Sequence, residues 1–422
     1  MKEEKKLRNL QALLEVSKAM GSEVHLDSLL NLILDKATDV MEAERSSLFL
    51  YDAENNELWS KIAQGMTSKE IRFPVGTGIA GDVAKTQEVA NIVDAYDDPR
   101  FNPAFDKKSN FRTKAVLCMP MISAKGELVG VIQVLNKKNG EIFNEDDQEL
   151  LQALGSHAAV ALQRAQLIEV YVENQKLEET LKMAHNIQMS ILPQKFPPFP
   201  EKQDLVDIFA LIEPAKEVGG DLFDFIMLDD EHLCFAIGDV SGKGVPAALF
   251  MAVTKTLLKA TANIDLHPKD IISRMNDFLS IDNEASMFCT FFCGILNIKT
   301  GKIEYSNGGH NPPYILHNDG SFETLTEPVG MALGVMDGLE FSPANTHLQK
   351  GEAIVLYTDG INEAMNEAFE EYEYRRMEKV FESLSSTASS KESCEVLLKD
   401  VKAFAGTAPQ SDDITLFMIR RI

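Results

Sequence analysis

The sequence of 422 residues predicts an α+β protein with two domains and a helical segment between them. Three observations lead to this prediction. Residues 7–162 mix helical apolar spacing with short strand-like runs, which indicates helices packed on a sheet. Residues 151–191 keep a helical spacing over many turns. Residues 206–422 alternate short strand-like and helix-like segments, which are separated by turn signals such as "EVGGD", "NGGHNPP" and "YTDG".

The composition limits the class of protein. Hydrophobic residues make up 45% of the chain, which is enough for buried cores, and the formal net charge is -24. Because binding to a phosphate backbone needs clustered Lys and Arg, this charge argues against nucleic acid as a partner. No stretch offers the ~18 apolar residues of a membrane span, and the amino terminus has no apolar signal region. We therefore expect a cytoplasmic protein with no membrane partner.

Cysteine usage excludes two further kinds of site. The five cysteines are an odd number and form no CxxC pair. Neither a disulfide framework nor a zinc site is therefore expected.

The first zone contains one clear helix pattern and several strand patterns. The segment "LDSLLNLILDKATDVM" (26–41) has helical apolar spacing. The expected strands are "SSLFLYD" (46–52), "ELWSKIA" (57–63), "KAVLCMPMI" (114–122) and "ELVGVIQVLNK" (127–137).

The middle zone shows a heptad-like repeat. Its first phase consists of Leu151, Leu154, Ala158, Ala161, Ala165, Ile168 and Val172. After a slip near Asn174, a second phase consists of Leu177, Leu181, Ala184, Gln188 and Ile191. One interpretation is an amphipathic helix packed on its own chain; we favour a parallel coiled coil between two copies of the chain. The prolines of "LPQKFPPFP" end this helix.

Aspartates mark the boundaries of several apolar runs in the last zone. They are Asp221 in "EVGGD", Asp239 in "AIGD", Asp359 in "VLYTD" and the pair Asp412 and Asp413 in "SDDITLFMI". Any one of them is readily explained as a turn or cap residue. Strand ends at one edge of a sheet converge, however, and gathered carboxylates repel one another unless a cation holds them. The set therefore indicates a site for a hard divalent cation such as Mg²⁺ or Mn²⁺.

Five ordered motifs, preceded by "AHNIQMSILP", carry a family resemblance over residues 184–422. They are "PAKEVGGDLFDF", "GDVSGKGVPAALFM", "YSNGGHNPPYIL", "VLYTDGINEA" and "SDDITLFMI". This part of the chain resembles the stage II sporulation protein E branch of the metal-dependent Ser/Thr protein phosphatases, the PPM superfamily. The resemblance implies an α-β-β-α sandwich with two Mn²⁺ or Mg²⁺ ions between the sheets. It also implies hydrolysis of phosphoserine or phosphothreonine by metal-activated water.

The same resemblance implies roles for particular residues. Asp239 would bridge both ions, the carbonyl of Val240 would contact one, and Asp221 would lie in the outer acidic shell. Asp359 and Asp412 would hold the other ion, with Asp413 as the alternative to Asp412. Relatives often carry histidine where this chain has Lys243, which we consider either a phosphate-attracting catalytic residue or a solvated turn lysine. We interpret His310 as a residue that fixes a turn.

The amino-terminal zone resembles a GAF domain, especially those of cyclic-nucleotide phosphodiesterases and adenylyl cyclases. The motifs are "GTGIAGDVAKTQEVANIVDAYDDPRFNPAFDKKSNFRTKAVLCMPM" and "GVIQVLNKKNGEIFNEDDQELL". The resemblance implies either a dimerisation module or a pocket for a cyclic nucleotide or another small ligand. The pocket positions would be Ser47, Ile79, Ala80, Asn102, Asp106, Ser109, Thr113 and Gln133.

These inferences give four predicted segments. They are an N-terminal helix (1–26), a GAF sensor domain (27–162), a helical, coiled-coil linker (163–192) and a PPM-type phosphatase domain (193–422). The leading hypothesis is a homodimeric, sensor-regulated protein phosphatase whose substrate, by resemblance, is a phosphorylated anti-sigma-factor antagonist. The alternative is a non-catalytic signalling adaptor whose phosphatase-like domain only binds a partner. We further expect the linker to switch the phosphatase domain between two states.

Overall fold

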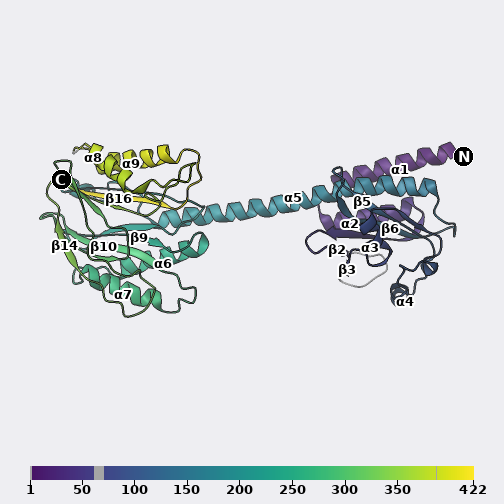
Figure 1. Cartoon of the computed structure of the whole chain (residues 1–422), viewed down its shortest axis with the longest axis horizontal. Coiled ribbons are helices and arrows are strands. Elements are labelled where there is room, and N and C mark those ends of the chain that lie inside the picture. The colour runs from purple at the N-terminus through teal and green to yellow at the C-terminus, as the bar shows by residue number, and fades with distance from the viewer. Residues whose placement is uncertain (1, 61–70, 386) are drawn as a thin grey trace. The chain divides into compact units, whose positions relative to one another are not determined.

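The structure is a computed structural model that describes residues 2–60, 71–385 and 387–422. The chain divides into two compact units, Met1–Leu177 and Glu178–Ile422. Helix α5 (Glu145–Ile191) begins in the first unit and ends in the second (Figure 1). Each unit has its own hydrophobic core.

The first unit is built on an antiparallel sheet with the strand order β3-β2-β1-β6-β5-β4. The strands are β1 (Ala43–Asp52), β2 (Glu57–Ser60), β3 (Ile71–Pro74), β4 (Ala90–Ile92), β5 (Val116–Ile122) and β6 (Leu128–Lys137). All four strands predicted for this zone are confirmed in the described residues. The last three positions of the predicted strand 57–63 lie outside those residues.

Helices cover both faces of this sheet. One face packs against α1 (Lys2–Ser22), α2 (Leu26–Val40) and the first half of α5, in a core that includes Leu29, Ile33 and Ile132. The other face packs against α3 (Gly78–Thr86), whose Ile79 and Val83 contribute to a second core. A short 3-10 helix (Ala95–Asp97) and α4 (Ala104–Ser109) lie in the connection from β4 to β5.

The structure corrects the predicted coiled-coil seam. Its first five positions, from Leu151 to Ala165, are buried in the core of the chain's own first unit. The apolar spacing there reflects packing against α1, α2 and the sheet, so it needs no second chain. The polar seam position Gln188 is also buried within one chain, in the second unit. Between these ends, residues 169–180 are exposed.

The second unit contains two five-stranded antiparallel sheets with the orders β14-β11-β10-β9-β8 and β13-β12-β15-β16-β7. The first is formed by β8 (Leu222–Met227), β9 (His232–Val240), β10 (Cys289–Asn297), β11 (Lys302–Gly308) and β14 (Ala344–His347). The second is formed by β7 (Val206–Glu213), β12 (Tyr314–Leu316), β13 (Phe322–Thr324), β15 (Ala353–Tyr357) and β16 (Ile414–Arg421).

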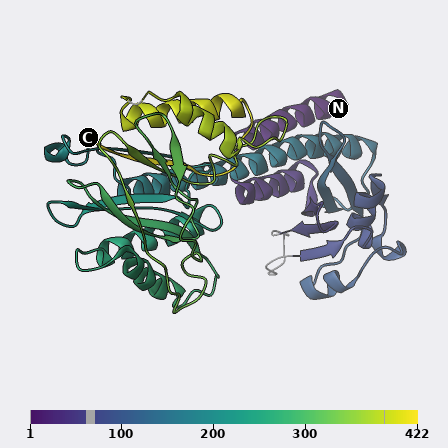
Figure 2. The same cartoon turned by 60° about the vertical axis from the view of Figure 1, so that its left-hand side comes forward.

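The two sheets lie face to face between two pairs of helices (Figure 2). Aromatic residues such as Phe235, Phe292 and Phe417 fill the space between the sheets. Helices α6 (Val245–Thr261) and α7 (Pro268–Ser280) pack on the outer face of the first sheet. Helices α8 (Glu373–Ser383) and α9 (Ser390–Ala405) pack on the outer face of the second. The predicted α+β class and the α-β-β-α layering are thereby confirmed.

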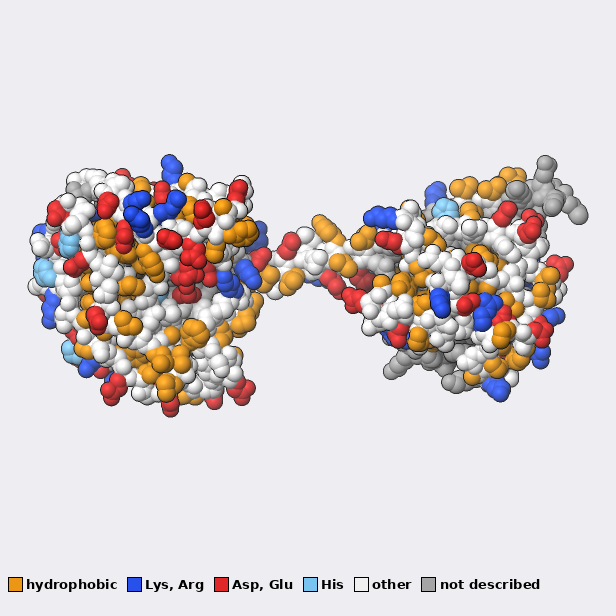
Figure 3. All heavy atoms as spheres, viewed as in Figure 1, with side chains coloured by type: hydrophobic (Ala, Val, Ile, Leu, Met, Phe, Trp, Pro, Cys, Tyr) orange, Lys and Arg blue, Asp and Glu red, His pale blue; other side chains and the backbone are white. Residues whose placement is uncertain are grey.

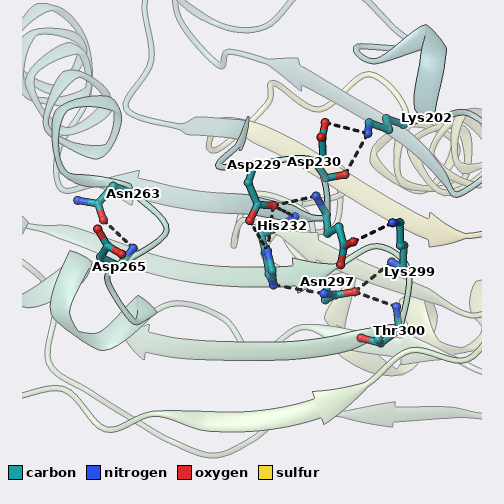
Figure 4. Close-up of polar contacts among 10 residues, drawn as sticks. Lys202, Asp229, Asp230, His232, Asn263, Asp265, Asn297, Lys299 and Thr300 are labelled. Carbon is teal, nitrogen blue, oxygen red and sulfur yellow. Dashed lines mark hydrogen bonds and ion pairs between the residues drawn. The ribbon is translucent and has the colours of Figure 1, made fainter.

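Polar turns close one end of the first sheet (Figure 4). Asp229 accepts hydrogen bonds from the backbone N–H groups of Glu231 and His232, and Lys299 forms an ion pair with Glu231 at 2.7 Å. These residues lie where β8 turns into β9 and where β10 turns into β11. The opposite ends of β8 and β9 carry the aspartates that the sequence singled out. No helix of the described residues has the length and apolar character of a membrane span.

Candidate metal centre

Strand ends from both sheets bring four of the predicted aspartates to one edge of the sandwich. Asp221 directly precedes β8, and Asp239 is the second-to-last residue of β9, in the first sheet. Asp359 lies two residues after the end of β15, and Asp412 lies two residues before β16, in the second sheet. Antiparallel pairing explains the convergence within each sheet, since Leu222 pairs with Gly238 and Tyr357 with Leu416. The local pattern of apolar strand and polar turn therefore decides where each acid lies.

Two threonines of the second sheet bind Asp221 of the first. The hydroxyls of Thr358 and Thr415 both donate to Asp221 Oδ2, at 2.7 Å and 2.5 Å. Burial, followed by the charges of Asp239 and Asp413, raises the pKa of Asp221 well above its usual range. These two hydrogen bonds connect the two sheets next to the acidic side chains. The sequence analysis missed both threonines, although Thr358 directly precedes Asp359 in "YTDG" and Thr415 follows Asp413 by two residues in "DDIT".

Asp239 interacts electrostatically with each of the other acids at this edge. Burial, followed by the charge of Asp359, raises its pKa to about 7. The charge of Asp412 acts in the same direction, while a hydrogen bond with Asp221 acts against it. Burial and the charge of Asp412 likewise raise the pKa of Asp359. Carboxylates that repel one another in this way are the donor set that hard divalent cations neutralise.

Asp412 and Asp413 have different surroundings. Asp413 is buried, with 7% of its surface exposed. Its Oδ1 accepts from the backbone N–H of Ala215 at 2.8 Å, and its Oδ2 accepts from that of Gly220 at 2.7 Å. Both carboxylate oxygens therefore hold the loop that precedes β8. Asp412 faces Lys243 instead and keeps 31% of its side chain exposed.

Lys243 lies in the Gly-Lys-Gly turn after β9 and reaches the acids. Its Nζ forms an ion pair with Asp412 Oδ2 at 2.9 Å and donates to the carbonyl of Ser411 at 2.5 Å. The hydrogen bond to Asp412 raises the pKa of Lys243. The side chain is therefore a cation beside the carboxylates.

His310 is buried, and its ring contacts both sheets, whereas the sequence analysis interpreted it as a residue that fixes a turn. Its Nε2 lies 3.1 Å from the carbonyl of Tyr357, which only accepts, so Nε2 carries the proton. Its Nδ1 lies 2.9 Å from the Thr290 hydroxyl, which donates to it. Burial lowers the pKa of His310 to about 4, which keeps the ring neutral.

Glycine is required where the loop before β8 passes the Val240 carbonyl. A Cβ on Gly220 would lie 2.7 Å from the Val240 oxygen. That contact is closer than van der Waals radii allow, so a side chain at this position would force the loop or the carbonyl to move. Val240 O is the backbone oxygen that the sequence analysis named as a metal ligand.

The end of α5 contacts the same loop. Gln188 Nε2 donates to the carbonyl of Gly219 at 2.6 Å, and the Gly219 N–H donates to Gln188 Oε1 at 3.1 Å. His185 Nδ1 lies 2.7 Å from the carbonyl of Glu217. Gln188 therefore docks on the loop that also carries Gly220 and Asp221, whereas the sequence analysis placed it on a coiled-coil seam.

The carboxylates share one edge but do not form a closed shell. In the part of the chain that the structure describes, no three Asp, Glu, His or Cys side chains converge at the spacing of metal ligands. Asp412 is paired with Lys243, and Asp221 accepts hydrogen bonds from Thr358 and Thr415. The carboxylate donors fit hard cations such as Mg²⁺ or Mn²⁺ in chemistry.

The first unit contains a second candidate site, a cavity of about 490 Å³ beside β1, β3, α3 and β6. Seven of the eight predicted pocket residues line it: Ser47, Ile79, Ala80, Asn102, Asp106, Thr113 and Gln133. The side chain of the eighth, Ser109, lies outside the described part of the chain.

Polar and cationic groups give this cavity its character. Asp106 is occupied internally, since it accepts from the N–H and the hydroxyl of Thr113, both at 2.7 Å. Arg45, Arg72 and Arg100 also line the cavity, and the sequence analysis missed all three. Arg45 lies 4.0 Å from the ring centre of Phe111. Arg72 forms an ion pair with Asp52 at 3.1 Å and Arg100 with Asp98 at 2.7 Å, so two of these three arginines are already paired with carboxylates of the chain.

Comparisons with known proteins agree with this division of the chain. Residues 229–422 match the family model described as Stage II sporulation protein E (SpoIIE), and residues 25–162 match the GAF domain model. Phosphoserine phosphatase RsbU of Bacillus subtilis (strain 168) is 33% identical over 194 residues, which cover 46% of this chain and 56% of RsbU.

Two further relatives cover one unit each. Dual 3',5'-cyclic-AMP and -GMP phosphodiesterase 11A of Takifugu rubripes is 39% identical over 166 residues, or 36% of this chain and 18% of that enzyme. The structure of the SiaA-PP2C domain of Pseudomonas aeruginosa matches 59% of this chain and 98% of that one, with a TM-score of 0.52 and 20% identity, a likeness of fold. The chain thus spans little more than half, or less, of the length of the curated relatives it matches. It carries a GAF domain followed by a domain of the stage II sporulation protein E family.

Proposed function

We propose that the second unit hydrolyses phosphoserine or phosphothreonine in a protein substrate, with Mn²⁺ or Mg²⁺ as cofactor. The observation that carries this proposal is the convergence of Asp221, Asp239, Asp359 and Asp412 from two sheets at one edge. Similarity to a phosphoserine phosphatase supports it.

The proposed ligands are the residues that the family resemblance implies. Asp239, Asp359, Asp412 and the Val240 carbonyl would hold two cations, with Asp221 behind them. Asp413 supports the loop rather than the ions, because both its oxygens accept backbone N–H groups. Bound cations at such a site supply an acidified water and neutralise charge on a phosphoryl group. The threonines that bind Asp221 keep the acidic edge rigid.

Lys243 contributes a positive charge at the mouth of the site. Its raised pKa keeps it protonated near neutral pH, so it attracts a phosphate rather than donating a proton to a leaving group. Release of Asp412 from Lys243 frees one carboxylate for a cation and the ammonium group for the phosphate.

Regulation is proposed to reach the site through α5. Its last turns bind the loop at Glu217 and Gly219, directly before Asp221. We infer that a small ligand in the GAF cavity, such as a cyclic nucleotide, alters this contact in a homodimer joined by the exposed linker. The substrate we propose is a phosphorylated anti-sigma-factor antagonist.

The test uses the full chain with Mn²⁺ or Mg²⁺ and a phosphoserine peptide. Asp239→Asn should lower turnover by about 100-fold or more, because a lost preorganised charge at a reacting centre costs about that much. Asp229→Asn, in a turn at the other end of the sheet, is the matched control and should keep its turnover. Turnover that is indifferent to chelator and to Asp239→Asn would refute the proposal.

The adaptor alternative keeps one supporting observation, the lack of a closed ligand shell among the described residues. It predicts that the protein binds a partner but no metal. Calorimetric titration with Mn²⁺ separates the two functions, since the phosphatase requires saturable binding that Asp239→Asn abolishes.

A further inference from the structure

A groove of about 460 Å³ lies beside the proposed metal centre, between the end of α7 and residues 334–337. Its lining is mixed: the apolar side chains are Ile281, Phe288, Val335 and Met336, and the polar ones are Ser280, Asn283, Ser286 and Asp337. Among these, Ile281, Val335 and Met336 expose 63%, 51% and 52% of their surface. Large apolar side chains gathered in this way on an exposed concave surface are typical of a binding site for protein.

The groove is continuous with the proposed active site through the backbone. The Ser241 N–H donates to the Phe288 carbonyl at 2.8 Å, and the Phe288 N–H donates to Ser241 Oγ at 3.0 Å. Ser241 follows Asp239 by two residues, and Thr290 pairs with Asp239 across β9 and β10. A polypeptide with its phosphorylated residue at the aspartates therefore has the groove within reach of its neighbouring residues.

The walls of the groove are held in place by buried or half-buried asparagines. Asn283 Nδ2 donates to the carbonyls of Met287 and Gly334, at 2.6 Å and 3.0 Å. Asn276 accepts from the Gly334 N–H at 3.0 Å and donates to the Met336 carbonyl at 2.9 Å. These bonds fix the backbone of both walls, so the exposed apolar side chains are presented by a preformed surface.

Asp337 is the one charged residue among those that line the groove, and more acids lie in the neighbouring sequence. The two segments that form the groove, residues 276–290 and 328–342, contain five acidic residues and no Lys or Arg. The acidic residues are Asp277, Asp282, Glu284, Asp337 and Glu340. Figure 3 shows one face of this unit, on which acidic and hydrophobic side chains gather close together. A partner with positive charge complements such a rim.

We propose that this groove binds an apolar and basic segment of the phosphorylated protein substrate, next to its phosphoserine. The inference rests on the proposed phosphatase function and adds what the enzyme recognises besides the phosphate. A doubly charged phosphate approaches a chain whose net charge is -24. Basic residues beside it offset that repulsion, while an apolar side chain fills the groove.

Peptide binding provides the first test. Two fluorescent phosphoserine peptides are compared by anisotropy in chelator, where no turnover occurs: one with leucine and arginines beside the phosphoserine, the other with serine and glutamates. The full chain should bind the first peptide about tenfold more tightly or better, as burial of an apolar anchor in a preformed pocket produces. Equal affinity for the two peptides would overturn the inference.

Surface variants provide the second test. The double variant Ile281→Ser/Met336→Ser should lose the preference, and Glu284→Lys/Asp337→Lys should shift it toward the acidic peptide. Phe278→Ser is the matched control, because Phe278 exposes 62% of its surface on α7 but does not line the groove. If Phe278→Ser has the same effect, or if the double variant changes the sedimentation of the protein instead, the groove binds something other than a substrate segment.

Turnover separates this inference from the proposed function. With Mn²⁺, hydrolysis of para-nitrophenyl phosphate, which has no flanking residues, should stay within about twofold of wild type in the groove variants. Hydrolysis of the leucine-arginine peptide should fall by about tenfold in kcat/KM. No hydrolysis of either compound by the wild type would refute the phosphatase, whereas equal losses on both compounds would refute the groove.

Discussion

Exchange of Asp413 for asparagine should destabilise the second unit, whereas the same exchange at Asp412 should remove activity. Asp413→Asn turns one oxygen into an amide that faces the N–H of Ala215 or Gly220, so a buried donor loses its acceptor. A hydrogen bond to a charged group is worth about 1.5–3 kcal/mol. A loss of about 2 kcal/mol corresponds to a decrease of about 4–8 °C in the melting temperature of a domain of this size.

Asp412→Asn should behave in the opposite way. Its ion pair with Lys243 is partly exposed, and such pairs contribute about 0–1 kcal/mol. The melting temperature should therefore change by no more than about 2–4 °C. Because Asp412 is a proposed metal ligand, however, Asp412→Asn should lower Mn²⁺-dependent turnover by about 100-fold or more.

The assay measures both quantities on each variant. Thermal unfolding is followed in chelator, and turnover of a phosphoserine peptide is measured well below the melting temperature over a range of Mn²⁺ concentrations. Asp413→Asn should stay within about tenfold of wild-type turnover at saturating Mn²⁺. The reverse pattern, an inactive but fully stable Asp413→Asn beside an active Asp412→Asn, would refute the assignment of the two residues.

Three further outcomes are expected. Gln188→Ala removes the hydrogen bonds to both main-chain groups of Gly219, so the Mn²⁺ concentration for half-maximal turnover should rise. The control Gln194→Ala, at an exposed residue, should match wild type. An unchanged Mn²⁺ dependence in Gln188→Ala would contradict the role of α5. The pKa of His310 is about 4 in the folded protein, so the free energy of unfolding, measured by chemical denaturation, should decrease by about 3 kcal/mol from pH 6.5 to pH 4. If the free energy of unfolding of His310→Gln decreases with pH as it does in wild type, His310 is not the cause. Insertions at Asn174 should change turnover with a seven-residue period, as a coupled helical linker requires; a flat series contradicts the switch.

The sign of the His310 prediction follows from its lowered pKa. Between pH 4 and 6.5, His310 is protonated in the unfolded chain but neutral in the folded protein, because the folded ring is buried between Thr290 and Tyr357. Stability from this residue is therefore complete above pH 6.5 and is lost as the pH decreases toward 4.

Much of the fold follows from local patterns. The run "HLCFAIGD" becomes β9, and the turn after it leads into α6, because alternation, glycine and proline act over a few residues. The same local patterns predict that each aspartate lies at the boundary of a strand. The apolar spacing of residues 151–165 also predicted a helix correctly, but it did not reveal which surface that helix covers.

What the sequence by itself determined is therefore the order of the elements, the two-domain division and the position of the acids along the chain. Only the tertiary structure decided which side chains meet. Neighbours in an extended segment point to opposite faces, so one of Asp412 and Asp413 had to face away from the edge; the loop at 215–220 decided that it is Asp413. Packing likewise placed Gln188 on Gly219 and three arginines around the GAF cavity. The physical reason is the distance along the chain over which each feature is decided. Residues near one another in sequence set whether a segment forms a helix or a strand, whereas the partner of a side chain comes from segments far apart in sequence.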